Sequence, residues 1–330
     1  MGATPSLGPP SRVNSMARKP GEQVRPQAER VRLCVPASTS NLGPGFDCLG
    51  LALSLHNVFI FEPAPEVSVV VKLHGCDDHD GQMVAEGRRN LVWQSADEVF
   101  RRTGARVNGL KITMNLAVPL ARGLGSSATA IIAGVAGANL LLGSPLSDGE
   151  VFGLIVDLEG HPDNVAASYY GGLTAAMICK RTPHLIRYDV PPDIRIVAAI
   201  PDYPLSTEKA RAALPKEVPL SDAVHNLART PFVIEALRNG ALENLALAMD
   251  DRLHEPYRIA LLRNGRAIRK AALAAGAAGV AISGAGPTMI AFCHEPTAKA
   301  IAEAMTAQLK GGRVEVLGVD KKGLRATVRK

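Results

Sequence analysis

The sequence predicts an α+β fold with two domains, and three observations carry this prediction. With 330 residues the chain is longer than a single domain with one hydrophobic core usually is. Strand patterns dominate its first part, whereas a β-α-β order closes it. Pro183, Pro191 and Pro192 cluster where the two patterns meet. We therefore expect a disordered tail at 1–30, an N-terminal domain at 31–190 and a C-terminal domain at 191–330.

The expected elements follow from hydrophobic periodicity, which is two residues in strands and about 3.6 in helices. Asn90 precedes one helical pattern as a good N-cap, and Ser147 or Asp148 caps another. The expected strands are 31–35, 49–55, 58–61, 67–73, 110–115, 172–179, 185–188, 194–200, 279–283, 289–293, 314–319 and 325–328. The expected helices are 91–102, 126–142, 147–158, 206–214, 223–238, 242–249, 259–275 and 298–309.

Charge and composition exclude several classes of protein. Five basic and two acidic side chains give residues 1–30 a charge of +3, half of the total of +6. No basic stripe interleaved with aromatic residues remains, which argues against nucleic-acid binding. The longest apolar run, 128–142, is too short and broken to span a membrane. Five scattered cysteines without a CxxC pair are typical of reduced thiols in a cytoplasmic protein.

An acidic stretch at 74–81 resembles a metal site but lacks the pattern of one. As an EF-hand it would place Cys76 at position one and Gly87 at position twelve, where a glutamate is needed. As a zinc site it has no distant pair of ligands. We expect an acidic surface loop between strands.

A glycine-rich segment, Pro119 to Ala128, stands between an expected strand and a long helix. Glycines let the backbone approach an anion closely, and the N-terminus of a helix presents unpaired N–H groups with a positive dipole. The segment lacks the GK[ST] of a Walker A loop. Gly123, Gly125 and Ala128 fit a dinucleotide fingerprint, with Asp148 twenty residues on, but no second parallel strand lies between.

The string Pro-x-x-x-Gly-Leu-Gly-Ser-Ser-Ala resembles, residue for residue, the phosphate loop of the GHMP kinases. The resemblance covers about residues 31–328. It implies an N-terminal domain like the second domain of ribosomal protein S5, a ferredoxin-like C-terminal domain, and ATP with Mg²⁺ as cofactors. The implied ATP-binding residues are Pro119, Leu120, Ala121, Arg122, Gly123, Leu124, Gly125, Ser126, Ser127, Ala128, Asn90 and Leu91.

Three more segments resemble motifs of the homoserine kinases within that family. Residues 36–47 contain Asn41 and Asp47 around a Gly-Pro-Gly turn, and residues 158–166 read Leu-Glu-Gly-His-Pro-Asp-Asn-Val-Ala. Residues 284–288, Gly-Ala-Gly-Pro-Thr, resemble a turn that folds against the phosphate loop. Taken alone, these segments also fit capping turns and a hairpin.

Two arginines distinguish homoserine kinases from their relatives. Thr207 and Arg211 lie one helical turn apart, and Arg258 stands in a separate segment. A guanidinium can bind a carboxylate in bidentate fashion, although either arginine alone would also fit a solvated surface. The resemblance implies that these residues receive the α-carboxylate of the substrate. The implied substrate-binding residues are Asn41, Asp47, His161, Asn164, Thr207, Arg211 and Arg258.

The implied activity is ATP-dependent phosphorylation of L-homoserine to O-phospho-L-homoserine, a step of threonine biosynthesis. Asp163, Ser127 and Glu159 are the implied catalytic residues, with Ser127 and Glu159 as magnesium ligands. Asp163 acts as a base or only orients the hydroxyl. A mevalonate-type kinase and a catalytically silent ligand-binding homologue are the alternatives. The expected partner is a small molecule rather than nucleic acid or membrane. The sequence is compatible with a homodimer but does not decide the oligomeric state.

Overall fold

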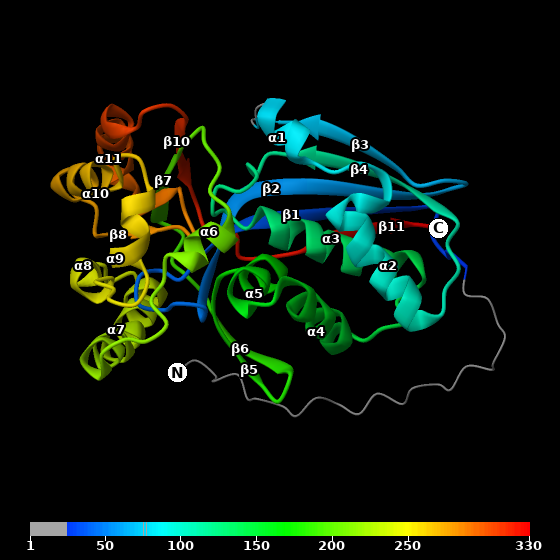
Figure 1. Cartoon of the computed structure of the whole chain (residues 1–330), viewed down its shortest axis with the longest axis horizontal. Coiled ribbons are helices and arrows are strands. Elements are labelled where there is room, and N and C mark those ends of the chain that lie inside the picture. The colour runs from blue at the N-terminus through cyan, green and yellow to red at the C-terminus, as the bar shows by residue number, and fades with distance from the viewer. Residues whose placement is uncertain (1–24, 75, 77) are drawn as a thin grey trace.

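The computed structural model describes residues 25–330 except 75 and 77. Its first sheet has the strand order β11-β1-β2-β4-β3, and a hairpin of β5 and β6 pairs with the start of β2. Helices cover one face of this sheet (Figure 1). The strands are β1 (Arg30–Ser40), β2 (Leu49–Ala64), β3 (Ser68–Leu73), β4 (Gly109–Leu116), β5 (Leu173–Cys179), β6 (Thr182–Tyr188) and β11 (Arg325–Arg329). The covering helices are α2 (Leu91–Thr103), α3 (Ser126–Leu141), α4 (Asp148–Glu159) and α5 (Pro162–Tyr170).

The second sheet is antiparallel and has the order β10-β7-β9-β8. Numbered along this half of the chain, that order is 4-1-3-2, and two helices, one directly before the second strand and one directly after the third, pack on the same face. This is the ferredoxin-like arrangement, as predicted. The strands are β7 (Ile194–Ile200), β8 (Gly279–Ile282), β9 (Met289–His294) and β10 (Arg313–Leu317), and the packed helices are α10 (Gly265–Ala274) and α11 (Glu295–Gln308).

The remaining elements lie near the junction of the two sheets or against the second sheet, and they include one helix of 20 residues (Figure 1). They are α1 (Asp78–Met83), the 3₁₀ turns Gly87–Arg89 and Ile259–Leu261, α6 (Thr207–Ala212), α7 (Leu220–Asn239), α8 (Leu245–Ala248) and α9 (Glu255–Arg258). A buried cluster that includes Leu51, Phe292 and Leu237 joins β2, the second sheet and α7. The two halves therefore share a hydrophobic core.

Two expected strands, 49–55 and 58–61, form the single strand β2, so the predicted break is wrong. The irregularity lies in β2 itself, next to the expected break: between the pairs Pro36–His56 and Ser38–Ala52, three residues of β2 stand opposite one residue of β1. Such a bulge bends a strand without ending it.

Two helix predictions also need correction. The segment 162–170 is a helix, α5, because Pro162 occupies its first turn, where a missing N–H costs nothing. The expected helix 259–275 is broken, since Asn264 has a φ of 59°, which a right-handed helix cannot contain.

Three features differ from the expected domain layout. β11 pairs with β1 in the first sheet, although residues 191–330 were grouped with the second half. Of the expected tail, 1–24 lies outside the described residues, whereas the N–H groups of Gln27 and Ala28 bond the carbonyl of Leu141. The acidic stretch is not wholly a surface loop, because Asp80 is buried and its Oδ1 accepts from the Leu120 N–H at 3.1 Å.

Within the described part of the chain, none of the helices is both long and apolar enough to cross a bilayer.

Gly50→Ala tests the close approach of β2 to α5. A Cβ on Gly50 would lie 2.1 Å from the carbonyl oxygen of Asp163, so we expect a loss of about 1–3 kcal/mol in unfolding free energy. Gly153→Ala is the control, because its Cβ would meet no atom within 4 Å and should stabilise α4 by about 0.5–1 kcal/mol. Urea unfolding of both variants checks this; equal stability of the two would contradict the packing described here.

Candidate active site

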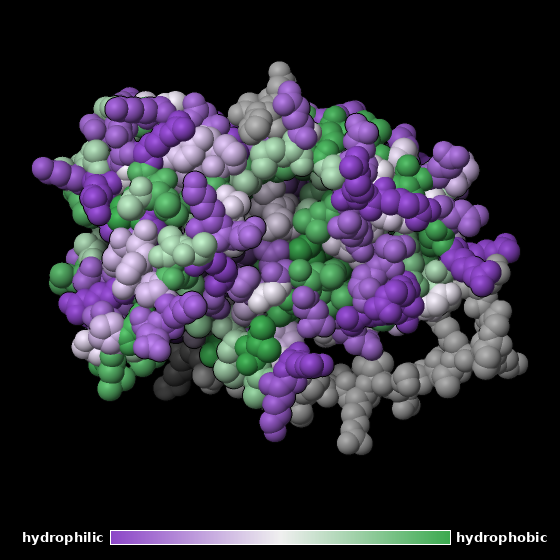
Figure 2. Space-filling view, viewed as in Figure 1, coloured by the Kyte–Doolittle hydropathy of each residue, from purple (hydrophilic) through white to green (hydrophobic). Residues whose placement is uncertain are grey.

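One cavity of about 390 Å³ contains most of the predicted site residues. It opens where the two halves of the molecule meet, and Figure 2 shows this hollow with hydrophobic residues along one margin. Its lining comes from β1, β2, the segment before α2, the glycine-rich segment, α5, α6, α9 and the turn at 284–286. Segments far apart in sequence therefore meet around one space.

The glycine-rich segment forms one wall of the cavity. Gly123 and Gly125 have φ values of 75° and 70°, which only glycine adopts without strain. A Cβ on Gly123 would lie 2.2 Å from the carbonyl oxygen of Ser283, whose hydroxyl donates to the carbonyl of Gly123 at 2.6 Å. The turn after β8 thus packs against this segment, as predicted. No side chain caps the start of α3, so its first N–H groups are free of side-chain partners.

Not every residue of that segment faces the cavity. Leu120, Ala121, Gly123, Gly125, Ser126 and Ser127 line it. Leu124 and Ala128 do not, because their side chains belong to the hydrophobic core, and Pro119 is buried away from it. Arg122 is turned away as well, and its guanidinium is 1% exposed. The side chains of these four residues therefore do not form the cavity wall, and their assignment to ATP binding stays a prediction.

Asn90 and Leu91 line the apolar end of the cavity, together with Met83 and Met114. Asn90 is buried, and its Oδ1 caps α2 by accepting from the Val92 N–H at 2.9 Å. Its Nδ2 donates to the carbonyl of Ala85. Asn90 therefore shapes the wall through its neighbours.

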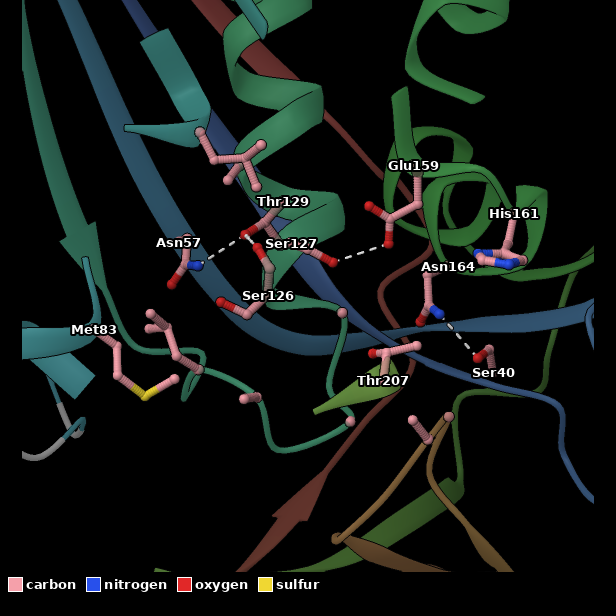
Figure 3. Close-up of a pocket in the computed structure, with 18 of the residues that line it drawn as sticks. Ser40, Asn57, Met83, Ser126, Ser127, Thr129, Glu159, His161, Asn164 and Thr207 are labelled. Atoms are coloured by element: carbon pink, nitrogen blue, oxygen red, sulfur yellow. Dashed lines mark hydrogen bonds between the residues drawn. The ribbon is translucent and has the colours of Figure 1, made fainter. Parts of the chain in front are cut away.

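Sequence analysis missed two polar residues beside the glycine-rich segment, Asn57 and Thr129 (Figure 3). Asn57 Nδ2 donates to Thr129 Oγ1 at 2.9 Å, and its Oδ1 accepts from the N–H groups of Ala117 and Val118. Thr129 Oγ1 in turn donates to the carbonyl of Ser126. Asn57 thus holds both ends of the segment. A buried asparagine in an apolar strand was the only sequence signal.

Two carboxylates, Glu159 and Asp163, line the cavity. Ser127 Oγ donates to Glu159 Oε1 at 2.9 Å, as Figure 3 shows. Burial, opposed by this bond and reinforced by Asp163, raises the pKa of Glu159 to about 7. Burial also raises the pKa of Asp163, although the Asn164 N–H donates to its Oδ1. Both groups thus hold protons more tightly than ordinary carboxyls.

Asn41 and Asn164 have most of their amide atoms engaged by the protein. Asn41 Nδ2 donates to the carbonyl of Gly284, and its Oδ1 accepts from the Asp47 N–H. Asn164 Nδ2 donates to Ser40 Oγ, and its Oδ1 accepts from Ser38 Oγ. Both line the cavity and hold its loops together. His161, at the N-terminus of α5, also lines it.

The cavity's other end holds Thr207, Arg211 and Arg258. Arg211 Nη2 donates to Asp47 Oδ1 at 2.8 Å. Arg258 is 2% exposed, and its Nη1 donates to the carbonyl of Gly284. Burial, followed by repulsion from Arg211, lowers the pKa of Arg258. All three predicted residues thus share one cavity with the glycine-rich segment.

Phe46 was missed although it stands inside a recognised segment. Its ring lies 5.6 Å from the Arg211 guanidinium and 5.1 Å from that of Arg258, and it stacks on His254. The ring's negative face partly offsets the repulsion between two cations.

The pKa of Glu159 predicts a pH dependence of stability. In the folded state its carboxyl keeps a proton up to about pH 7, whereas an unfolded glutamate releases it near its ordinary value of 4.5. Unfolding then releases a proton, so this group's contribution falls as pH rises from about 5 to 7. Glu159→Gln removes this titrating carboxyl. Urea unfolding should therefore show the wild type losing stability relative to the variant as pH rises from about 5 to 7. Parallel profiles would contradict the assignment.

Comparisons with known proteins agree with this geometry. Residues 90–172 match the sequence model of the GHMP kinases N terminal domain, and residues 233–311 match that of the GHMP kinases C terminal. A homoserine kinase of Synechococcus sp. is 46% identical over 299 residues, covering 89% of this chain and 97% of the relative. A homoserine kinase of Gloeobacter violaceus is 45% identical over 294 residues, covering 89% and 98%.

Solved structures extend the likeness to three dimensions. The crystal structure of homoserine kinase from Cytophaga hutchinsonii has a TM-score of 0.80 at 27% identity, covering 92% of this chain and 99% of that one. L. major mevalonate kinase, at 17% identity, has a TM-score of 0.70 and covers 90% and 98%, which shows the shared fold alone. By its two matched family domains, its sequence relatives and its fold, the chain belongs to the homoserine kinases of the GHMP kinase family.

Proposed function

We propose that this protein transfers the γ-phosphoryl group of ATP to the hydroxyl of L-homoserine, giving O-phospho-L-homoserine and ADP. One observation carries the proposal: a single cavity has an anion-binding backbone at one end and two arginines at the other. The carboxyls of Glu159 and Asp163 lie on the cavity wall between these ends. The space therefore suits a nucleotide triphosphate facing a short, carboxylate-bearing alcohol.

The nucleotide would place its phosphates on Gly123–Ser127 and the start of α3. Free N–H groups and the helix dipole favour negative charge there. The base would lie against the apolar residues around Leu91 and Met114.

Ser127 and Glu159 fit a Mg²⁺ ion that accompanies the phosphates. Mg²⁺ takes oxygen ligands and is usually held by one or two protein oxygens with waters and substrate phosphates. A hydroxyl and a carboxylate oxygen 2.9 Å apart at the helix start supply that set. Bound there, the ion would neutralise charge developing on the transferred phosphoryl group.

The acceptor's α-carboxylate would bind between Arg211 and Arg258, with Thr207 beside it. Among the described atoms, Arg211 Nε is buried without a hydrogen-bond partner, which leaves a donor for a ligand. The Asp47 carboxylate beside Arg211 suits the substrate's ammonium group. This pairing of charges selects an α-amino acid.

Asp163 would orient the hydroxyl and receive its proton as the bond to phosphorus forms. Phosphoryl transfer passes through a loose transition state, so positioning and charge neutralisation supply most of the rate. A carboxyl whose pKa is raised by burial accepts a proton more readily than an exposed one.

We also propose that residues 31–190 form the ATP-binding domain and that the protein works in the cytoplasm. All five cysteines are described and none forms a disulfide, which suits a reducing compartment.

A mevalonate-type kinase is the alternative within the family. Mevalonate also carries a carboxylate, but it lacks an amino group for Asp47 to meet. A catalytically silent homologue has no need for Ser127, Glu159 and Asp163 together. ADP release with Mg-ATP, measured in parallel with L-homoserine, mevalonate, galactose and shikimate, separates these functions. Turnover with L-homoserine alone supports the proposal, and no turnover with any acceptor supports the silent binder.

Arg258→Ala tests the carboxylate clamp. Removing one partner of a buried charge pair costs about 2–5 kcal/mol, so we expect a large rise in KM for L-homoserine. Arg229→Ala is the control, since Arg229 also bonds backbone carbonyls but does not line the cavity. Steady-state kinetics check both variants; an unchanged KM for homoserine in Arg258→Ala would refute the clamp.

A further inference from the structure

Arg122 belongs to the glycine-rich segment, yet its side chain points away from the cavity and bonds the protein. Its Nε donates to the carbonyl of Pro201 at 3.1 Å, and its Nη2 donates to that of Asp202 at 2.9 Å. Its Nη1 donates to the carbonyl of Leu120 at 2.6 Å and lies 3.5 Å from Asp80 Oδ1. One guanidinium thus joins three separate stretches of chain.

Each of these stretches leads to residues that line the cavity. Asp80 lies in α1, whose last residue, Met83, lines the apolar end. Leu120 lines the cavity itself. Pro201 and Asp202 follow β7, a strand of the second sheet. Thr207, the first residue of α6, comes a few residues after them.

A second bond runs in parallel with the guanidinium. The Leu205 N–H donates to the carbonyl of Ala121 at 2.9 Å, directly beside Arg122. Leu205 also lines the cavity, and α6 begins two residues later with Thr207 and carries Arg211. A shift of the glycine-rich segment would therefore move the start of α6.

The backbone around Arg122 has an uncommon shape that these bonds hold. Ala121 has a φ of 51° and Gly123 a φ of 75°, so residues on both sides lie in the left-handed region. For a residue with a side chain such as Ala121, this conformation costs on the order of 1 kcal/mol or more and persists only where surrounding structure fixes it. The bonds of Arg122 to Leu120 and to Pro201 span this point.

A buried arginine can also be a purely structural group, and an apolar side chain often replaces a buried ion pair without loss of stability. An apolar side chain could fill the space but could not bond the carbonyls of Leu120, Pro201 and Asp202. Stability and coupling between the two ends of the cavity can therefore be separated by substitution.

We propose that Arg122 is a positioning residue that couples the phosphate-binding segment to the acceptor clamp on α6, so that bound nucleotide raises the affinity for the acceptor. This inference rests on the proposed function. It assigns Arg122 no contact with either ligand. Coupling between two sites is reciprocal, so the acceptor should raise the affinity for nucleotide by the same factor.

The test is calorimetric titration of L-homoserine into the full-length protein, with and without a non-hydrolysable Mg-ATP analogue. In the wild type we expect the analogue to tighten homoserine binding by about fivefold or more, the lower end of common coupling factors. In Arg122→Met we expect the analogue to change the affinity for homoserine by less than about twofold. If Arg122→Met does not fold, Arg122→Lys takes its place in the same titration. The lysine keeps a cation opposite Asp80 but lacks the planar fork that bonds the carbonyls, so we expect the same loss of coupling.

Arg187→Met is the matched control. Arg187 donates to the carbonyls of Tyr170, Gly171 and Lys321 and pairs with Asp189, so it has an equivalent set of partners outside the cavity. Its substitution should leave the coupling factor at the wild-type value even if the melting temperature falls.

The outcomes separate this inference from the proposed function. If the wild type neither binds nor phosphorylates L-homoserine, the proposed function fails. If it phosphorylates homoserine but shows no coupling, or if the Arg122 variant keeps the wild-type coupling factor, the inference is wrong. Loss of coupling in Arg122→Met and Arg187→Met alike would assign the effect to general destabilisation and would also overturn it.

Discussion

Two neighbouring guanidinium groups, one buried and one partly exposed, lie beside one carboxylate and impose the constraint on which the rest of the site depends. Arg211 is paired with Asp47, whereas Arg258 is almost fully buried and bonds mainly carbonyl groups. Like charges held this close in a partly desolvated space repel each other, as the lowered pKa of Arg258 reflects. The ring of Phe46 offsets part of this repulsion, and an anionic ligand would offset the rest.

The fold keeps this cationic end at a fixed position relative to the glycine-rich segment. The turn after β8 touches both: Gly284 accepts from Arg258 and Asn41, and Ser283 donates to Gly123. The shared hydrophobic core holds the two sheets together around these contacts. Specificity for a short amino acid and phosphoryl transfer therefore depend on the same few polar contacts across the junction.

Much of this could be predicted from sequence where local sequence dictates the chemistry. Gly123 and Gly125 stand where the backbone needs positive φ, and Asn90 and Ser147 cap the helices that follow them. Contacts between distant residues could not be predicted: Asn57 and Thr129 are 72 residues apart, and Arg122 bonds residues 79 and 80 positions away. The sequence around Arg122 suggested a ligand contact, whereas the structure buries its guanidinium against Asp80 and three backbone carbonyls.

If the arginine pair recognises the carboxylate of the acceptor, the protein must discriminate strongly against an acceptor that lacks one. The most direct test compares kcat/KM for L-homoserine with that for 3-aminopropan-1-ol, which is homoserine without its carboxylate, in the wild type and in Arg211→Met. We expect a preference for homoserine of about 100-fold or more in the wild type, since buried charge pairs contribute several kcal/mol, and a much smaller preference in the variant. Equal use of both alcohols by the wild type would contradict it.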